Sequence, residues 1–247
     1  MITIKTKEEI EILREGGRRL AEIMEEISRK VKPGTSSVEL NDLAEKMAIQ
    51  GGDKPAFLNY KPYGAKRPYP ASLCVSVNDE IVHGIPNEGG KILKEGDIVS
   101  LDMGLVYKGL ITDMAITAPV GKIDDSARQL IEVCKESLMK GIEAARGGDN
   151  IGDIGFAIER HIRPFGYGIV RELHEDPYVP NFGKRGVGEK LKPGMILAIE
   201  PMINEGTEKV ILDDDSYTYR TKDGARSAHF EHTILITKKE AEILTKL

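Results

Sequence analysis

The sequence predicts an α+β fold in which two similar helix–helix–strand halves pack about a pseudo-twofold axis. Residues 96–117 alternate between apolar and polar side chains in two runs joined by a turn, which is typical of a β-hairpin. A pair of amphipathic helices precedes this hairpin and a second pair follows it. Shifting the chain by 114 residues places Gly34 on Gly148 and Leu40 on Ile154, which indicates a weak internal repeat.

The composition is that of an ordinary globular protein. The chain has 247 residues, 40% hydrophobic and 30% charged, enough for one large domain or two small ones. A net charge of −5, with basic residues spread throughout, argues against specific nucleic-acid binding. Because Cys74 and Cys134 are the only cysteines, we expect no disulfide framework and a reducing compartment. No leader is visible and no apolar run approaches roughly 18 residues, so we expect a cytoplasmic protein without a membrane span.

Capping signals mark the start of each predicted helix in the first half. Thr6 and Glu9 form a capping box, and the helix after it is expected to run to Val31. Ser36 and Glu39 repeat the signal before a second helix that ends at 51–52, a Gly-Gly pair. In the second half, helices are predicted over 124–146 and 151–163. Neither of the first two helices carries visible chemistry, so we expect both to pack the core.

The hairpin carries two aspartates. A two-residue turn at Tyr107 and Lys108 would place Asp102 directly opposite Asp113 on one side of the sheet. Like charges at such a distance destabilise a sheet, so a shared proton, a basic side chain or a divalent cation is needed. The alternative is a different register in which one aspartate belongs to the turn.

Further polar residues lie at the ends of predicted strands. A strand over 72–78 leads to His83, whose alternatives are a cleft residue and a hydrogen-bonded structural histidine. In the β-rich final third, a short strand is predicted over 168–173. Two apolar strands, 194–202 and 230–237, each carry one carboxylate, and burial of such a group is costly unless it is paired or bound to metal.

Four strand carboxylates form the most informative set. Their convergence in a core would require cations, and two divalent ions balance four negative charges. Carboxylates favour Mg²⁺ or Mn²⁺, whereas an added imidazole extends the range to Fe, Co or Zn. The sequence has neither a Gly-x-Ser-x-Gly nor a Walker-type loop, so acyl-serine and phosphate-loop chemistry are not supported. The four are Asp102, Asp113, Glu200 and Glu231.

At these positions the sequence resembles the type I methionine aminopeptidases, a metallopeptidase family with the pita-bread fold. The resemblance covers nearly the whole chain and implies a single catalytic domain over residues 1–247, with a curved antiparallel sheet between the two halves. The motifs that carry it are Val75–Asn78 with His83–Pro86, Ser100–Asp102 with Asp113, His174–Pro177, Leu191–Met195 with Ile199–Met202, and Phe230–Thr233.

The resemblance implies an enzyme that removes the initiator methionine from nascent polypeptides with a water activated by two metal ions. Asp102, Asp113, Glu200 and Glu231 would be the metal ligands, with Asp113 and Glu231 bridging. Glu200 would also transfer the proton of the water. The metal pair is Mn, Fe, Co or Zn; the sequence does not determine which.

The resemblance also implies residues that bind the substrate. His83 and His174 would lie beside the scissile peptide, as both catalytic and substrate-binding groups. Tyr69, Cys74 and Tyr217 would line the methionine pocket, joined by Phe57 and Tyr60. The implied partner is the N-terminal methionine of nascent chains, with association with the ribosome compatible with this role and a monomer expected.

The sequence departs from the family in one metal ligand. The family places a histidine in a Gly-His-Gly-x-Gly run shortly before the His-Glu-x-Pro segment, and this chain has no such histidine. Either Tyr167 takes its place, or a segment between the strand 168–173 and His174 is missing; the second is favoured because that strand runs straight into His174. The loop 61–68 is also longer than usual. The alternative function is therefore an impaired pita-bread protein that binds a peptide or a partner.

Overall fold

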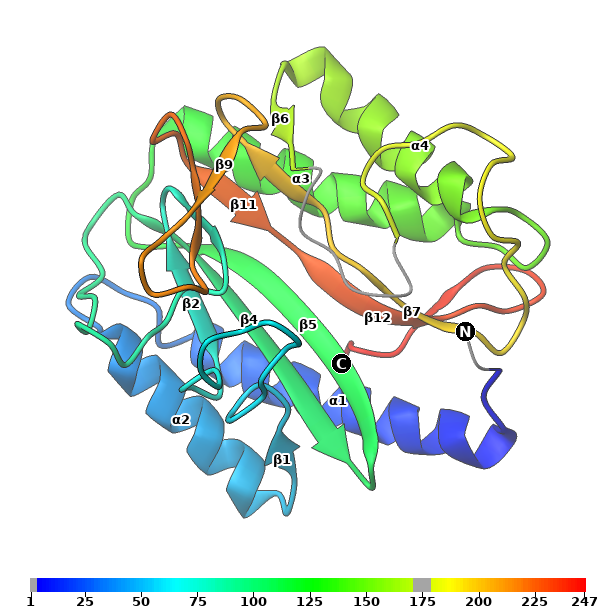
Figure 1. Ribbon diagram of the computed structural model, residues 1–247, viewed down its shortest axis with the longest axis horizontal. Helices are drawn as coiled ribbons and strands as arrows, with labels where there is room; N and C mark the ends of the chain where they lie inside the picture. Colours follow the sequence, from blue (N-terminus) through cyan, green and yellow to red (C-terminus); the bar gives the residue numbers. More distant parts are fainter. Residues whose placement is uncertain (1–3, 171–178) are drawn as a thin grey trace.

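Residues 4–170 and 179–247 are described by the computed structural model, and they confirm the α+β fold. Figure 1 shows α1 and α2 alongside one half of the strands and α3 and α4 alongside the other half. The helices are α1 (Lys7–Ser28), α2 (Ser37–Gln50), α3 (Asp125–Ala144) and α4 (Ile151–Ile162), with a 3₁₀ turn at Arg163–Phe165. The strands are β1 (Lys54–Pro55), β2 (Cys74–Val77), β3 (Glu80–Val82), β4 (Ile98–Tyr107), β5 (Leu110–Pro119), β6 (Gly168–Ile169), β7 (Ile196–Ile199), β8 (Met202–Asn204), β9 (Val210–Leu212), β10 (Tyr219–Thr221), β11 (Ser227–His229), β12 (Glu231–Leu235) and β13 (Glu242–Ile243).

The helices begin where their capping residues predict. Thr6 and Ser36 each accept a hydrogen bond from the third residue of their helix, and both capping boxes are complete. The first helix ends at Ser28 and not at Val31, because the N–H groups of the next residues bond three residues back and tighten the chain into a turn. Within the described ranges, no helix is long and apolar enough to cross a membrane.

One antiparallel sheet joins the two halves. Its order is β1-β4-β5-β12-β13, with β2 paired to β4 and β7 paired to β12. Smaller sheets have the orders β3-β10-β9 and β11-β8-β6. Each long strand predicted in the final third is shorter or interrupted: the first breaks at Glu200 and Pro201 between β7 and β8, since proline cannot donate to a ladder. The second begins at Glu231, after the separate strand β11.

Two hydrophobic cores correspond to the predicted halves. One packs α1 and α2 against β2 and β4, with Leu20, Met24 and Leu101 fully buried. The other packs α3 and α4 against β7 and β12, with Leu130 and Ile158 fully buried. Both cores lie on the same face of the central sheet, where Ile116 of β5 packs against each of them, and the polar residues on the opposite face are left for the cleft described below.

Candidate active site

The register of the hairpin differs from the prediction by two residues. Asp102 pairs with Ala115, and Asp113 pairs with Gly104, so the two aspartates are diagonal neighbours and not directly opposed. The turn lies at Lys108 and Gly109, whose φ angles are 47° and 84°. A tight hairpin of this kind needs positive φ at both central residues, which glycine adopts without strain. A shift of two residues conserves the face, so the aspartates still share one side of the sheet.

The third carboxylate reaches the same face from the next strand. Ala115 pairs with Asp102 on one side and with Glu231 on the other, so these three residues form a row across β4, β5 and β12. Asp113 lies two residues from Ala115 along β5 and shares its face. The small Ala115 side chain leaves the space between the carboxylates open, and one oxygen from each of the three acids lies within 4.8 Å of the others.

Thr233 holds the backbone of this cluster. Its hydroxyl accepts a hydrogen bond from the N–H of Asp113 at 2.8 Å and donates one to the Asp113 carbonyl at 2.9 Å. The N–H of Met114 donates to the Asp113 carboxylate at 2.9 Å. These contacts fix β5 beside β12, so the positions of the carboxylates are set by the sheet itself.

The electrostatics of the cluster favour a bound cation. Asp102 and Glu231 are only 7% and 5% exposed. Burial raises the pKa of both carboxyl groups well above their usual values, and the neighbouring Asp113 raises them further. Oδ1 of Asp102 is buried without a hydrogen-bond partner among the described residues. Such a set of oxygen donors fits a divalent ion, which would compensate the charge and occupy the unpaired oxygen.

A second ligand group shares Glu231 with the first. It contains Glu200, between β7 and β8, and His229, the last residue of β11. His229 is missing from the sequence-based set of candidates. The alternation of side chains along a strand could have identified it, because His229 and Glu231 are two residues apart and a shared face follows if the strand continues. With Glu231 common to both groups, the residues fit two ions side by side.

His83 lies at the rim of the same cleft in a strained backbone conformation. Its φ angle is +58°, which is uncommon for a residue other than glycine and is found most often at functional sites. The backbone that follows is held by the N–H of Gly84, which donates to the Ser76 hydroxyl at 3.1 Å. The Thr218 hydroxyl lies 3.4 Å from the His83 carbonyl and makes its shorter hydrogen bond, of 2.6 Å, to Asp215. The residue is exposed to the cleft, and the protein atoms that surround the ring on its other sides lower the pKa of the imidazole by desolvation.

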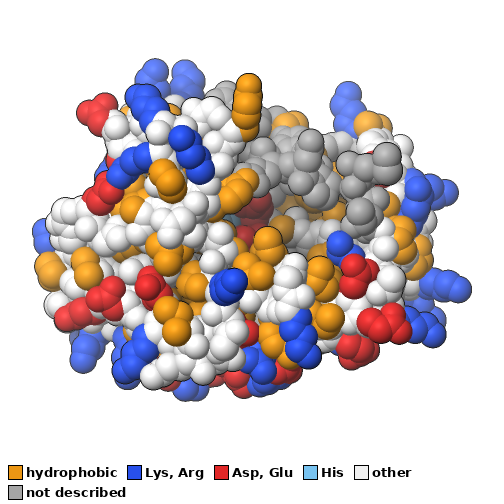
Figure 2. All heavy atoms as spheres, turned by 60° about the horizontal axis from the view of Figure 1, so that its bottom comes forward, with side chains coloured by type: hydrophobic (Ala, Val, Ile, Leu, Met, Phe, Trp, Pro, Cys, Tyr) orange, Lys and Arg blue, Asp and Glu red, His pale blue; other side chains and the backbone are white. Residues whose placement is uncertain are grey.

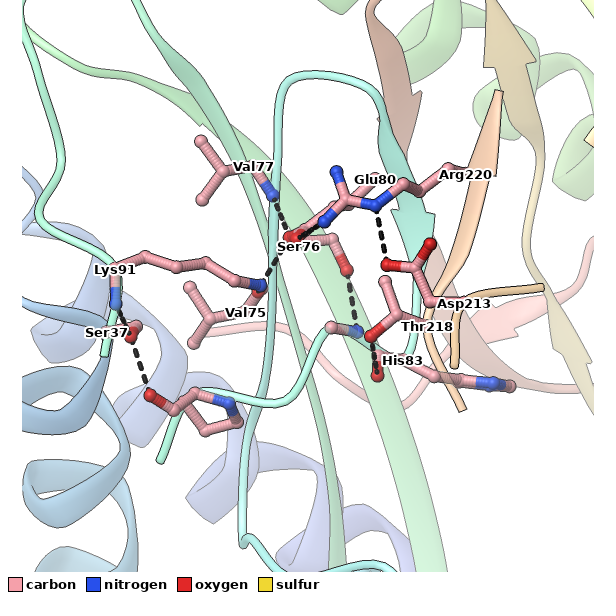
Figure 3. Close-up of polar contacts among 12 residues, drawn as sticks. Ser37, Val75, Ser76, Val77, Glu80, His83, Lys91, Asp213, Thr218 and Arg220 are labelled. Atoms are coloured by element: carbon pink, nitrogen blue, oxygen red, sulfur yellow. Dashed lines mark hydrogen bonds and ion pairs between the residues drawn. The ribbon is translucent and has the colours of Figure 1, made fainter. Parts of the chain in front are cut away.

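A buried ion network supports the strand that precedes His83. Figure 3 shows Glu80 of β3 between Lys91 and Arg220. The Lys91 ammonium lies 2.5 Å and the Arg220 guanidinium 2.7 Å from the Glu80 carboxylate, which also accepts the N–H of Val77. Arg220 bonds Asp213 in addition. A buried charge with three donors is stable, and here it anchors β3 to the loop and strand on either side.

The carboxylates lie at the floor of a cleft of about 600 Å³. Figure 2 shows acidic side chains at the bottom of a hollow on this face. One wall is apolar: Tyr69 and Tyr217 pack edge to face with ring centroids 5.1 Å apart, and Cys74 lies beside them. Burial raises the pKa of the Cys74 thiol well above its usual value, so the wall is uncharged at neutral pH. Phe57 and Tyr60 also line the cleft, as does the exposed Tyr63 of the loop 61–68.

His174, a further predicted candidate, lies outside the described residues. The Tyr167 hydroxyl donates a hydrogen bond to Gln129 of α3 at 3.1 Å, and its ring stacks on Phe165. The Tyr167 side chain therefore contacts α3 and the 3₁₀ turn. The residues just after it form β6, which pairs with β8.

Comparisons with known proteins agree with this geometry. A family model described as metallopeptidase family M24 matches residues 11–238. Methionine aminopeptidases from Aquifex aeolicus and Bacillus subtilis are each 43% identical, with 100% of this chain covered and 99% and 100% of theirs. The crystal structure of a methionine aminopeptidase from Thermotoga maritima superposes with a TM-score of 0.93 at 42% identity, covering 100% of both chains. The chain therefore belongs to metallopeptidase family M24 and, within it, to the methionine aminopeptidases.

Proposed function

We propose that this chain hydrolyses the peptide bond after an N-terminal methionine, with residues 1–247 acting as one catalytic domain. The observation that carries the proposal is the convergence of buried carboxylates at the floor of a cleft with an apolar wall. The family supplies the reaction class, since M24 proteins are metallopeptidases and the relatives are methionine aminopeptidases. The enzyme is a metal-dependent hydrolase.

The residues that would hold the metal ions are Asp102, Asp113, Glu200 and Glu231, with Asp113 and Glu231 shared between two ions. The positions of these oxygens support this assignment for the three acids of the sheet, and Glu200 lies in the adjoining group. Divalent ions bound there would supply an activated water and polarise the substrate carbonyl. Of the metals implied by the resemblance, Mn suits four carboxylates best, and an added imidazole would extend the range to Fe, Co and Zn.

Glu200 is suited to proton transfer. Its side chain is 29% exposed, unlike the fully enclosed Asp102 and Glu231, so an oxygen of Glu200 can meet a water in the cleft. We assign to its carboxylate the acceptance of the water's proton and its delivery to the leaving nitrogen. His83, held at the rim and neutral at neutral pH, would form a hydrogen bond to the substrate peptide, and we propose the same role for His174.

The apolar wall would receive the methionine side chain. Tyr69, Cys74 and Tyr217 present carbon and sulfur surface next to the carboxylates, and Tyr69 is held by a hydrogen bond to the Gly84 carbonyl at 3.1 Å. A flexible thioether packs well against aromatic rings. The same wall gives no partner to a charged side chain, which supports selection of methionine.

The substrates in the cell would be the initiator methionines of nascent polypeptides, encountered near the ribosome. We propose that the enzyme acts in the cytoplasm as a monomer. Two free, buried cysteines are compatible with a reducing compartment. Neither the described residues nor the relatives provide a feature that favours the alternative of an impaired peptide-binding protein.

The test is release of methionine from a Met-Ala-Ser peptide with Mn²⁺, Co²⁺ or Fe²⁺ added in turn, beside measurement of bound metal. We expect turnover with at least one metal and none with chelator. The variant Asp113→Asn should abolish metal binding and turnover together, because it removes an oxygen donor common to both ions. Unchanged metal stoichiometry in that variant would contradict the ligand assignment, and metal binding without turnover would contradict the proposed catalytic function.

A further inference from the structure

His229 has a buried side chain without hydrogen bonds. The residue is 1% exposed, and within the described part of the chain neither ring nitrogen has a hydrogen-bond partner. Buried polar groups in folded proteins are nearly always paired, and one that is not calls for a specific explanation. Burial of this unpaired imidazole therefore destabilises the folded protein unless a bound ligand pairs with it.

The backbone of His229 is fixed, so the ring cannot leave this position easily. The N–H of His229 donates to the Thr117 hydroxyl at 2.9 Å, and that hydroxyl donates to the His229 carbonyl at 2.8 Å. Thr117 is held in turn by the Ser100 hydroxyl at 2.8 Å. Residues from β4 and β5 thus anchor the end of β11, while the ring itself receives no such support.

The ring is directed at the carboxylates. Nε2 of His229 lies 3.6 Å from Oε2 of Glu200, which is too far for a good hydrogen bond. One ligand atom from each of Glu200, His229 and Glu231 lies within 4.8 Å of the other two. Two donors bound to one ion, each about 2.1 Å from it, are roughly 3.0–3.5 Å apart. The observed separation therefore needs only a small contraction to become a metal site.

We propose that Nε2 of His229 is a metal ligand in this protein, binding one of the two ions together with Glu200 and Glu231. This inference rests on the proposed metallopeptidase function. It supplies the site with an imidazole although the chain lacks the Gly-His-Gly run that carries a ligand histidine in the family it resembles. A nitrogen donor also changes the metals that the site accepts, since imidazole suits Fe, Co and Zn better than a purely carboxylate site does.

The experiment is pulsed electron paramagnetic resonance on the full chain loaded first with less than one equivalent and then with two equivalents of Mn²⁺, so that the ligand group containing His229 is filled. Spectra are compared between protein at natural abundance and protein in which all histidines carry ¹⁵N. A directly bound imidazole shows a nitrogen coupling that changes with the isotope. This readout needs no turnover, and the wild-type chain alone gives it, so it does not depend on a variant that folds.

The variants assign the nitrogen to a residue. His229→Asn should remove the nitrogen coupling and weaken Mn²⁺ binding at least about 100-fold by calorimetric titration, more than loss of an outer-shell partner costs. His161→Asn is the matched control. His161 lies on α4, its Nε2 is 3.2 Å from Glu136 Oε2, and its loss should change neither the coupling nor the affinity.

Three outcomes overturn the inference. Bound Mn²⁺ without nitrogen coupling in the wild-type protein would leave the proposed function standing and reject His229 as a ligand. A coupling that survives in His229→Asn would assign the nitrogen to another histidine. No binding of Mn²⁺ under any condition would reject the proposed function as well as this ligand.

Discussion

His232 follows Glu231 directly, but its ring is buried on the face of the sheet away from the carboxylate cluster. The alternation of β12 directs the two side chains to opposite faces, and the His232 ring contacts the Thr245 hydroxyl at 2.9 Å. Burial, together with the nearby Lys135 and Lys246, lowers the pKa of His232 to about 4. The ring is therefore neutral in the folded protein at every pH at which the enzyme would work.

This pKa predicts a specific loss of stability in acid. Between about pH 6.5 and 4 the unfolded chain binds a proton at His232 and the folded chain does not, so the free energy of unfolding falls as the pH drops through this window. The full difference is about 3 kcal/mol. We expect urea unfolding in the presence of chelator to show this slope in the wild-type chain and a flatter one in His232→Gln. Parallel curves for the two proteins would contradict the prediction.

Site residues can be predicted from the sequence where a charged side chain stands in an apolar strand. A polar residue in a less unusual setting gives no such signal. A carboxylate in an apolar strand is conspicuous, and this identified Glu200 and Glu231 before the structure placed them. The sequence does not single out His229, because the predicted strand begins at Phe230. The separate strand β11, which ends at His229, is not predicted. The strain at His83 was also invisible, since nothing in a His-Gly pair specifies a positive φ.

At the scale of elements, the helices were predictable because their capping side chains act locally. The register of the β4–β5 hairpin was not, since it depends on which residues of the turn tolerate positive φ. The wrong register nevertheless gave the right shared face for Asp102 and Asp113, because the error was an even number of residues. The breaks around Pro201 and Phe230 depend on tertiary pairing, which no local pattern records.

The contact of α1 with the C-terminal segment gives a test at this scale. A Cβ added to Gly17 would lie 2.3 Å from the Leu244 carbonyl oxygen, which belongs to backbone and cannot move cheaply. Helix propensity alone predicts that Gly17→Ala stabilises by about 1 kcal/mol. We expect the reverse, a loss of at least about 2 kcal/mol from overpacking. The measurement is chemical unfolding of the purified variant.

Gly16→Ala is the comparison for that experiment. A Cβ there would be 3.2 Å from the Tyr107 Cβ, a contact that a slight shift relieves. Its cost should be clearly smaller than that of Gly17→Ala. Equal effects of the two substitutions would mean that the close approach at Leu244 is not what requires glycine.

At the scale of the whole molecule, the carboxylates connect the two halves. Asp102 comes from β4, which packs against α1 and α2, whereas Glu231 comes from β12, which packs against α3 and α4. Repulsion between them acts across the central sheet, and a bound cation reverses its sign. Stability and metal binding are therefore coupled in this architecture.

Asp102→Asn should separate these two effects. Without metal, the neutral amide relieves a buried group that is otherwise costly, so we expect the variant to be more stable than the wild type by roughly 1–3 kcal/mol. With Mn²⁺ at about 100 times Kd, the wild type gains about 2.7 kcal/mol, and the variant should gain little. Thermal unfolding with chelator and with Mn²⁺ measures both. A variant that is less stable than the wild type without metal would contradict the premise of stored repulsion.

The contact between α1 and the end of the chain also has a consequence for biosynthesis. Gly17 lies against Leu244, and Arg14 binds Glu242 through two hydrogen bonds of 2.7 Å, so the first helix obtains these partners from residues more than 220 positions later. At about 5–20 residues per second, translation takes on the order of 10–50 s to supply them. Contacts of such high sequence separation are costly in loop entropy and form late. During that interval, the apolar face of α1 that will meet Leu244 has no permanent cover.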